Sequence, residues 1–274
     1  MIGSTVPENS DDLSAGLDLT RPSPSRLRDY LLGGSYHFSA DRRVAGALEA
    51  RLPYVREMAW LNRAFLRRAV SLLLGRGVHQ FVDVGFGIPA VGNVHEAAQR
   101  VNPSCRVVYV ERDPVEVAQG ELMLSRNARA TVVHSDPCDP AAVLGNPGTT
   151  QMLDLAEPIG LLMAGSLHLV PDSRRPVEIV ARYVEALAPD SYLVLSHATA
   201  DRRPMDTEVV VETLRKEGIT VYPKPYHEVV RFFAGTELVA PGVVTADEWY
   251  PEQPVDPAER LAGAQLYVGV GRKR

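Results

Sequence analysis

Cysteine is scarce in this sequence, because Cys105 and Cys138 are the only two among 274 residues. They lie far apart and form no C-x-x-C pair, so the sequence predicts neither a disulfide framework nor a thiolate zinc site. We therefore expect no bound metal ion. Such sparse use of cysteine is typical of a protein that works in the reducing cytoplasm.

Long apolar runs and an excess of positive charge are also lacking. No stretch reaches the roughly 18 consecutive apolar residues of a membrane span, and residues 1–20 lack the apolar segment of a signal peptide. The net charge is −5, and the one basic cluster near an end is the short run 272–274. Since a phosphate backbone needs a larger basic surface, neither a membrane nor a nucleic acid is an expected partner. The sequence leaves a homo-oligomer open.

The N-terminal part of the chain divides into a tail and a helical region. Residues 1–20 are small and polar, so we expect a disordered tail there. Helical spacing of apolar residues then predicts three helices, over 26–32, 41–51 and 55–74. We assign these helices to an N-terminal helical cap over 21–77.

From His79 onward, short β-branched runs alternate with helical patterns, which is typical of βαβ units and a parallel sheet. The expected strands are 80–84, 105–111, 130–134, 158–163, 192–196, 243–246 and 266–270. Asp-Pro pairs at 113 and 139 predict helix starts, because aspartate caps a helix and proline suits its first turn. The sequence therefore predicts an α/β, Rossmann-like core over 78–274 that forms a single domain with the cap.

A glycine bend follows the first expected strand in the run Phe81-Val-Asp-Val-Gly-Phe-Gly87. Glycines at this place allow a tight turn and a close approach of the backbone to a ligand. The next glycine, Gly92, comes too late for a dinucleotide fingerprint, which disfavours a pyrophosphate site. Asp83 stands two residues before Gly85, where its carboxylate is suited to a ligand ammonium group. An ammonium group is present in S-adenosylmethionine and absent from NAD.

Two further carboxylates follow the next strands. Glu111 ends the second strand, where a carboxylate can accept from both hydroxyls of a ribose. Asp136 comes just after the third strand and is suited to the exocyclic amine of adenine. With Asp83, these carboxylates predict a site for a nucleoside with an amino-acid tail, although each one alone is also compatible with a helix cap or a solvated group.

Several segments together resemble the actinomycete-type S-adenosyl methyltransferase family. They are Asp29-Tyr-Leu-Leu-Gly-Gly34, Asn62-Arg-Ala-Phe-Leu-Arg-Arg68, Gly92-Asn-Val-His-Glu96, Val108-Tyr-Val-Glu-Arg-Asp-Pro114, Leu167-His168 and Leu193-Val-Leu-Ser-His-Ala198. The resemblance extends from about residue 21 to 272. It implies a class I methyltransferase fold, with a seven-stranded, mostly parallel sheet whose last strand is antiparallel. It also implies S-adenosylmethionine as cofactor, a small-molecule methyl acceptor and a role in secondary metabolism.

The sequence departs from the family pattern at a few positions. Glu111 stands where the family favours aspartate, which keeps the role of a bidentate acceptor. Phe86 and Ile88 occupy positions that threonine or leucine often takes. Cys138 replaces a usual apolar or basic neighbour of Asp136, so we expect a slightly altered adenine pocket.

The remaining candidate residues would complete the cofactor site and serve the reaction. Arg63 borders the apolar stripe of its helix and is suited to pair with the cofactor carboxylate through its planar guanidinium group. Arg112 and Ser166 are further candidates for the cofactor site. His168 and His197 follow the fourth and fifth strands at the ligand-facing edge, and either is a candidate general base, His168 first, if the acceptor must lose a proton.

Two other functions remain compatible with the sequence. A nicotinamide-dependent oxidoreductase would explain the Gly-x-Gly bend and the spacing to Glu111, but it lacks the third glycine. A non-catalytic regulator that binds S-adenosylmethionine would explain the absence of an unambiguous base. The methyltransferase is the leading hypothesis.

Overall fold

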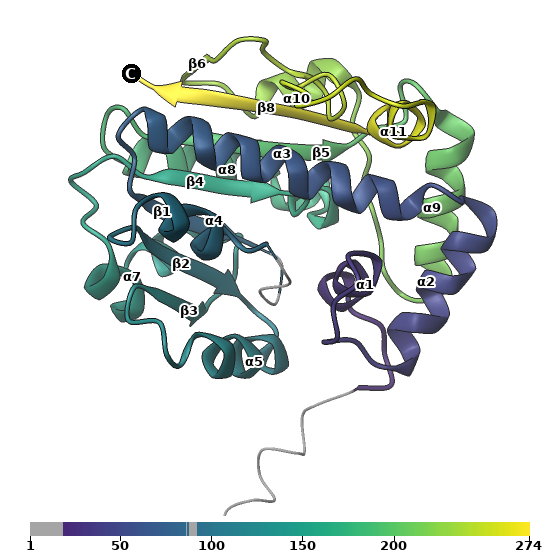
Figure 1. The fold of residues 1–274 in the computed structure, drawn as a ribbon, viewed down its shortest axis with the longest axis horizontal. Helices are drawn as coiled ribbons and strands as arrows, with labels where there is room; N and C mark the ends of the chain where they lie inside the picture. The colour runs from purple at the N-terminus through teal and green to yellow at the C-terminus, as the bar shows by residue number, and fades with distance from the viewer. Residues whose placement is uncertain (1–18, 86, 88–91) are drawn as a thin grey trace, which may run out of the picture.

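The computed structural model describes residues 19–85, 87 and 92–274 (Figure 1). Most of the tail predicted over 1–20 therefore lies outside the described residues, as do Phe86 and Ile88.

Over the described residues, one sheet of eight strands forms the centre of the molecule. The strands are β1 (Gln80–Val84), β2 (Arg106–Glu111), β3 (Ala130–His134), β4 (Gly160–Ala164), β5 (Tyr192–Ala198), β6 (Thr236–Leu238), β7 (Val244–Thr245) and β8 (Leu266–Lys273). The order is β3-β2-β1-β4-β5-β8-β6, and β7 also pairs with β8. Strands β1 to β5 are parallel, whereas β8 is antiparallel to β5. The predicted mostly parallel sheet with an antiparallel last strand is confirmed, with one strand more than the seven expected because the short β6 was missed.

The position of β1 between β2 and β4 matters for function. The chain passes from β1 outward to β2 and β3 and then returns to the other side of β1 for β4. In open parallel sheets, such a reversal of strand order opens a crevice beyond the carboxyl ends of the strands, where ligands bind. The glycine bend that follows β1 lies at this reversal.

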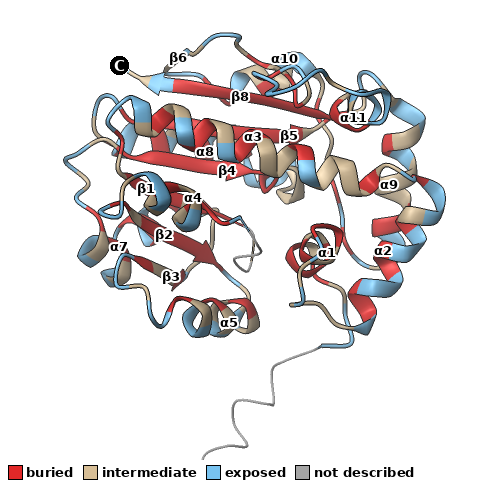
Figure 2. Cartoon of the chain, viewed as in Figure 1, coloured by how far each residue is buried: buried red, intermediate tan, exposed pale blue. Residues whose placement is uncertain are grey.

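Helices cover both faces of the sheet (Figure 1). One face carries α3 (Val55–Gly75), α4 (Val94–Val101), α5 (Pro114–Leu124) and α11 (Pro257–Gly263), and the other carries α6 (Pro140–Leu144), α7 (Pro147–Met152), α8 (Pro176–Ala186) and α10 (Tyr226–Arg231). The central strands are buried along almost their whole length (Figure 2), as their apolar sequences require. Asp113 and Asp139 cap α5 and α6 as expected. The short α7 and α11 were not predicted.

Three helices form a separate cluster beyond the carboxyl ends of the strands. They are α1 (Pro24–Leu31), α2 (Ser39–Arg51) and α9 (Pro204–Lys216), and apolar side chains from all three share one core. The long α3 joins this cluster to the sheet, because it contacts α1 and α2 as well as β4, β5 and β8 (Figure 1). The division into a cap over 21–77 and a core over 78–274 stays a prediction.

Candidate functional site

Asp83, near the end of β1, faces basic groups from the helices. Its carboxyl lines a small cavity with Arg28, Asn62 and Arg63. Burial raises the pKa of Asp83 to about 6, against the opposing effect of the Arg63 and Arg28 guanidinium groups. The group is therefore a carboxylate at neutral pH and lies beside two cations. The structure brings together Asp83 and Arg63, two residues selected from the sequence.

The bend after β1 needs glycine. Gly85 has a φ of 76°, in the left-handed region, and a Cβ built there would lie 3.2 Å from the Cβ of Ser166. Ser166 itself is buried, and its Oγ has no hydrogen-bond partner among the described residues. Because Gly85 has no side chain, the space beside the hydroxyl of Ser166 stays open. That hydroxyl has no partner among the described residues and is suited to bind a ligand.

Glu111 is fixed at the end of β2 by backbone hydrogen bonds. Its Oε1 accepts from the N–H groups of Arg112 and Asp113 at 2.8 and 3.1 Å, and its Oε2 accepts from the N–H of Gly87 at 3.4 Å. The side chain lines a cavity of about 450 Å³ with Arg112. Glu111, Arg112 and Gly87 are therefore brought together, as the sequence predicted for a shared site.

Asp136 lines a third cavity, of about 50 Å³, with Arg112 and Ser166. Its Oδ1 accepts from the N–H of Cys138 at 2.9 Å, and its Oδ2 accepts from Arg174 at 2.8 Å. Burial works to raise the pKa of Asp136, but these two bonds outweigh it and the pKa is lowered. Arg174, in the short η2 turn (Asp172–Arg174), had no sequence signal that connected it with Asp136.

The three carboxylates line adjoining cavities. Arg112 lines both the Glu111 cavity and the Asp136 cavity. Leu169 lines these two and also a third, apolar cavity, which in turn shares Arg28 with the Asp83 cavity. A series of cavities that share lining residues therefore follows the carboxyl ends of β1, β2, β3 and β4.

The two candidate histidines lie in different surroundings. His168, in the short η1 turn (Leu167–Leu169), lines the apolar cavity, and burial keeps its pKa well below the ordinary value. His197 is fully buried, donates from Nδ1 to the carbonyl of Ala198 at 2.8 Å if Nδ1 carries the proton, and stacks on Phe232. Burial lowers the pKa of His197 to about 4. It lines neither the apolar cavity nor the cavities of Asp83, Glu111 and Asp136, and its ring meets that of His168 edge-on at 5.8 Å.

Two residues at the site were not selected from the sequence. Arg28 donates to the carbonyl of Gly165 at 3.2 Å, and burial together with Arg63 lowers its pKa to about 10. Asn62 donates to the carbonyl of Ala164 and accepts from the hydroxyl of Ser196 at 2.6 Å. Asn62 lies inside a family-like segment, which is the one signal that pointed to it, whereas Arg28 had none.

Glu116 makes an unexpected buried contact between α5 and the start of α1. Its Oε1 accepts from the hydroxyl groups of Ser23 and Ser25, and Arg26 lies 4.0 Å away. Burial, with the charge of Glu111, raises the pKa of Glu116 to about 8. In the sequence, a lone glutamate on a surface helix indicates a solvated group, so this contact could not be foreseen.

The fold and the site together define a class of protein, the Rossmann-like methyltransferases. Its features here are the parallel order β3-β2-β1-β4-β5, the antiparallel strand beside β5 and the acidic residues around a glycine bend. The chain belongs to the S-adenosyl methyltransferase family, whose sequence profile matches residues 10–274. It is an enzyme that uses S-adenosylmethionine to transfer a methyl group.

Solved structures support this membership. A DUF574 family protein from Streptomyces avermitilis is 33% identical, with a TM-score of 0.87 over 94% of this chain and 99% of that one. A candidate methyltransferase from Thermobifida fusca is 36% identical, with a TM-score of 0.87 over 95% of this chain and 98% of that one. An O-methyltransferase family protein from Burkholderia thailandensis shares the fold at 12% identity, with a TM-score of 0.50 over 80% of this chain and 59% of that one. No curated protein matches the sequence.

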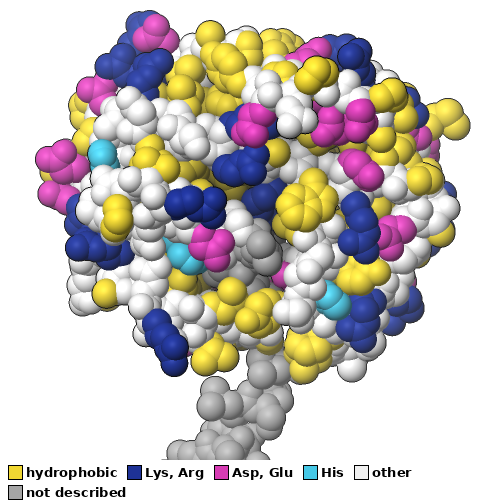
Figure 3. Space-filling model, in the orientation of Figure 1, with side chains coloured by type: hydrophobic (Ala, Val, Ile, Leu, Met, Phe, Trp, Pro, Cys, Tyr) yellow, Lys and Arg dark blue, Asp and Glu magenta, His cyan; other side chains and the backbone are white. Residues whose placement is uncertain are grey.

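Over residues 19–85, 87 and 92–274, no helix has the length and apolar character to cross a membrane, and no cluster of three or more His, Cys, Asp or Glu side chains is arranged to hold a metal ion. Figure 3 shows basic and acidic side chains interspersed over the face it displays, with several basic ones near its centre.

Proposed function

We propose that S-adenosylmethionine binds along the cavities at the carboxyl ends of β1 to β4. The observation that carries this proposal is the placement of Asp83, Glu111 and Asp136 on a series of cavities linked through the apolar cavity, with Gly85 beside Ser166 and Pro137 of the Asp136 cavity. In this arrangement Asp83 takes the ammonium group, Glu111 the ribose hydroxyls and Asp136 the adenine amine. The unpartnered hydroxyl of Ser166 supports the fit, because a buried polar atom needs a partner that a ligand can supply.

Arg63 supplies a positive charge to the Asp83 cavity, which we propose holds the amino-acid end of the cofactor. An amino acid carries both an ammonium and a carboxylate, and the Asp83 cavity offers a carboxylate together with the guanidinium groups of Arg63 and Arg28. Because the groups are partly buried, their interactions with a ligand are weakly screened by water. We assign Arg63 to the cofactor carboxylate. Arg112 lines the Glu111 and Asp136 cavities, and we assign it to the region of the nucleoside.

The acceptor in this proposal is a small molecule. The cofactor supplies a methyl group on a positively charged sulfur, which is already a good leaving group. The protein therefore contributes mainly by alignment, which can lower a barrier by up to about 7–11 kcal/mol. His168 is the candidate to take a proton from the acceptor, since its imidazole is neutral at neutral pH. His197 packs behind it and has the role of a positioning residue that fixes the ring.

Isothermal titration calorimetry with S-adenosylhomocysteine and with adenosine tests this arrangement. Adenosine has the ribose and adenine but no amino-acid end. We expect Glu111→Gln to weaken the binding of both ligands. We expect Asp83→Asn to weaken the binding of S-adenosylhomocysteine and to leave the binding of adenosine unchanged. Equal effects of both variants on both ligands would contradict the arrangement.

We also propose a cellular setting, which the sequence supports. The sparse cysteines favour the cytoplasm, and we propose a role in secondary metabolism, where small-molecule acceptors are methylated. Fractionation of the source cells and a search of their extracts for a labelled methyl product test these two statements.

A further inference from the structure

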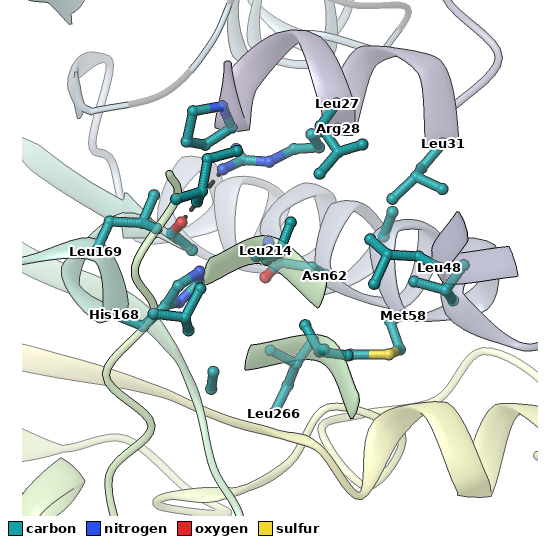
Figure 4. Close-up of a pocket in the computed structure, with 18 residues that line it drawn as sticks. Leu27, Arg28, Leu31, Leu48, Met58, Asn62, His168, Leu169, Leu214 and Leu266 are labelled. Carbon is teal, nitrogen blue, oxygen red and sulfur yellow. Dashed lines mark hydrogen bonds between the residues drawn. The ribbon is translucent and has the colours of Figure 1, made fainter. Parts of the chain in front are cut away.

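An apolar cavity of about 160 Å³ lies between the helical cluster and the ends of β4 and β5. Its walls come from parts of the chain that are distant in sequence, and Figure 4 shows their side chains converging from different elements. Apolar side chains make up most of the wall, including Leu27, Leu31, Leu48, Met58, Leu214 and Leu266. An apolar cavity of about 150 Å³ holds one aromatic ring, so this one is suited to a molecule of that size.

Three polar side chains gather at one part of this cavity. Figure 4 shows Arg28, Asn62 and His168 apart from Leu31, Leu48 and Met58. Asn62 uses its oxygen and one N–H within the protein, which leaves the second N–H of its amide group to donate. The neutral imidazole of His168 has one nitrogen that accepts and one that donates. A ligand group that both donates and accepts therefore suits this part of the wall.

The cavity adjoins the part of the cofactor site that holds the amino-acid end. Arg28, Asn62 and Ala59 line both the apolar cavity and the Asp83 cavity. A molecule in the apolar cavity is thus next to the place where the proposed arrangement brings the amino-acid end of the cofactor.

The charge of a ligand affects how well it fits the apolar cavity. A cationic amine would be buried in an apolar wall beside the guanidinium group of Arg28, which costs free energy through lost hydration and through repulsion. Arg28 would attract a carboxylate, but the carboxylate would lose its hydration among leucine side chains, and Arg28 already donates to the carbonyl of Gly165. A hydroxyl group loses less hydration than a charged group, and hydrogen bonds to Asn62 and His168 offset that loss.

We propose that this cavity binds the methyl acceptor, a neutral apolar hydroxyl compound the size of one aromatic ring, with its hydroxyl beside Asn62 and His168. The inference rests on the proposed function, because it takes the Asp83 cavity as part of the cofactor site. It adds the acceptor's chemical class and the residues that select it.

Methionine methyl groups allow a direct test by NMR with [methyl-13C]methionine in the full-length chain. Met58 lines the apolar cavity, Met163 lines the Asp136 cavity and Met205 is 77% exposed. The probe is p-cresol, a neutral hydroxyl compound. We expect saturable shifts of the Met58 signal with p-cresol, and no shift of Met205. An unshifted Met58 signal up to millimolar p-cresol would overturn the inference.

The same spectra separate this inference from the proposed function. S-adenosylhomocysteine is expected to shift Met163, which lies in the region proposed for the nucleoside. If Met163 fails to respond to S-adenosylhomocysteine while Met58 responds to p-cresol, the cofactor arrangement is wrong and the cavity is a ligand site of another kind. If Met163 responds and Met58 does not, the cofactor arrangement holds and the acceptor inference fails.

A matched pair of variants on α9 tests where p-cresol binds. Val210 lines the cavity, whereas its neighbour Val209 does not, and both are partly buried against the same apolar cluster. Val210→Phe fills part of the apolar cavity and is expected to weaken the binding of p-cresol at least tenfold. The response of Met163 to S-adenosylhomocysteine is expected to stay unchanged. Val209→Phe is expected to keep both responses. Equal loss of p-cresol binding in both variants would contradict binding in this cavity.

Related probes test the chemical class. Toluene lacks the hydroxyl, benzylamine is a cation and benzoate is an anion at neutral pH. We expect p-cresol to bind more tightly than toluene, and benzylamine and benzoate to bind least. Tighter binding of benzoate or benzylamine than of p-cresol would overturn the assignment to a neutral hydroxyl compound.

Discussion

Asp83 shows how a single residue combines folding with function. Its carboxyl lies near the end of a buried strand, where burial raises its pKa. Arg63 and Arg28 oppose that effect, so the pKa of about 6 stays below neutral pH. Because two cations surround it, the group is charged when a ligand ammonium would arrive.

The pKa of Asp83 predicts how cofactor affinity depends on pH. Above pH 6 the group is a carboxylate and accepts from an ammonium group, and below pH 6 it becomes protonated, so the affinity for S-adenosylhomocysteine should fall as the pH drops from 7.5 to 5. A hydrogen bond between charged groups contributes about 1.5–3 kcal/mol, and we expect Asp83→Asn to weaken binding about tenfold or more at pH 7.5. Calorimetry at several pH values measures both effects. If the affinity of Asp83→Asn for S-adenosylhomocysteine falls with pH as the wild-type affinity does, another group causes the fall.

Gly85 provides a test of the bend itself. Gly85→Ala places a Cβ 3.2 Å from the Cβ of Ser166 at a positive φ, so we expect a loss of about 1–2 kcal/mol in the free energy of unfolding and weaker binding of S-adenosylhomocysteine. Gly46→Ala is the control, because Gly46 lies in α2 with open space around it and the change should stabilise by about 0.5–1 kcal/mol. Urea titration measures both. Unchanged stability in Gly85→Ala would contradict the strained bend.

At the scale of elements, α1 is held against α5 by a polar contact. Ser23, Ser25 and Arg26 meet the buried carboxyl of Glu116, and Arg26 also bonds to the buried Asp41 on α2. These residues flank the Glu111 cavity, since Ser23, Ser25 and Glu116 line it. The contact therefore determines how the helical cluster borders the proposed cofactor site.

This contact should respond to pH. Glu116 has a folded pKa of about 8, above the ordinary value of 4.5, so the folded protein binds the proton more tightly than the unfolded chain. The stabilisation is complete below pH 4.5 and is lost as the pH rises to 8. The charges that face the group are those of Arg26, Asp113 and Glu111. We expect Glu116→Gln to lessen the fall in melting temperature between pH 5 and pH 8.5.

The control for this experiment is Glu121→Gln, since Glu121 is an exposed residue of the same helix. Its melting temperatures should follow those of the wild type at every pH. If Glu116→Gln falls with pH as steeply as Glu121→Gln, the carboxyl of Glu116 is not the source of the pH dependence.

At the scale of the whole molecule, the helical cluster and the sheet form the site together. Arg28 and Asn62 come from helices, and Asp83 and Ser166 come from the ends of strands. A ligand that binds across them should stabilise the folded state as a whole. At a concentration one hundred times its Kd, S-adenosylhomocysteine should add about 2.7 kcal/mol, which for a chain of this size raises the melting temperature by roughly 5–10 °C.

Scanning fluorimetry with S-adenosylhomocysteine and with NAD measures this stabilisation. We expect no shift with NAD, because the bend after β1 lacks the third glycine of a pyrophosphate site. A shift with NAD equal to that with S-adenosylhomocysteine would contradict the proposed arrangement of the site.

The sequence by itself determined the sheet and the line of acidic residues along its edge. Apolar runs of β-branched residues predicted β1 to β5 nearly residue for residue, because a parallel strand buried on both faces has few alternatives. Asp83, Glu111 and Asp136 could be predicted to lie along one edge of the sheet, since each stands at or near the carboxyl end of a strand and parallel strands end at one edge. Short elements such as β6 and α7 escaped prediction because their periodic signal spans too few residues.

Only the tertiary structure decided what surrounds that edge. Arg28 reaches Gly165 across a large separation in sequence, Arg174 pairs with Asp136, and Glu116 meets Ser23 and Ser25. No local pattern encodes such contacts, because they depend on how helices from distant segments pack beyond the strand ends. The apolar cavity arises in the same way, from single side chains on helices and strands whose spacing in sequence carries no common period.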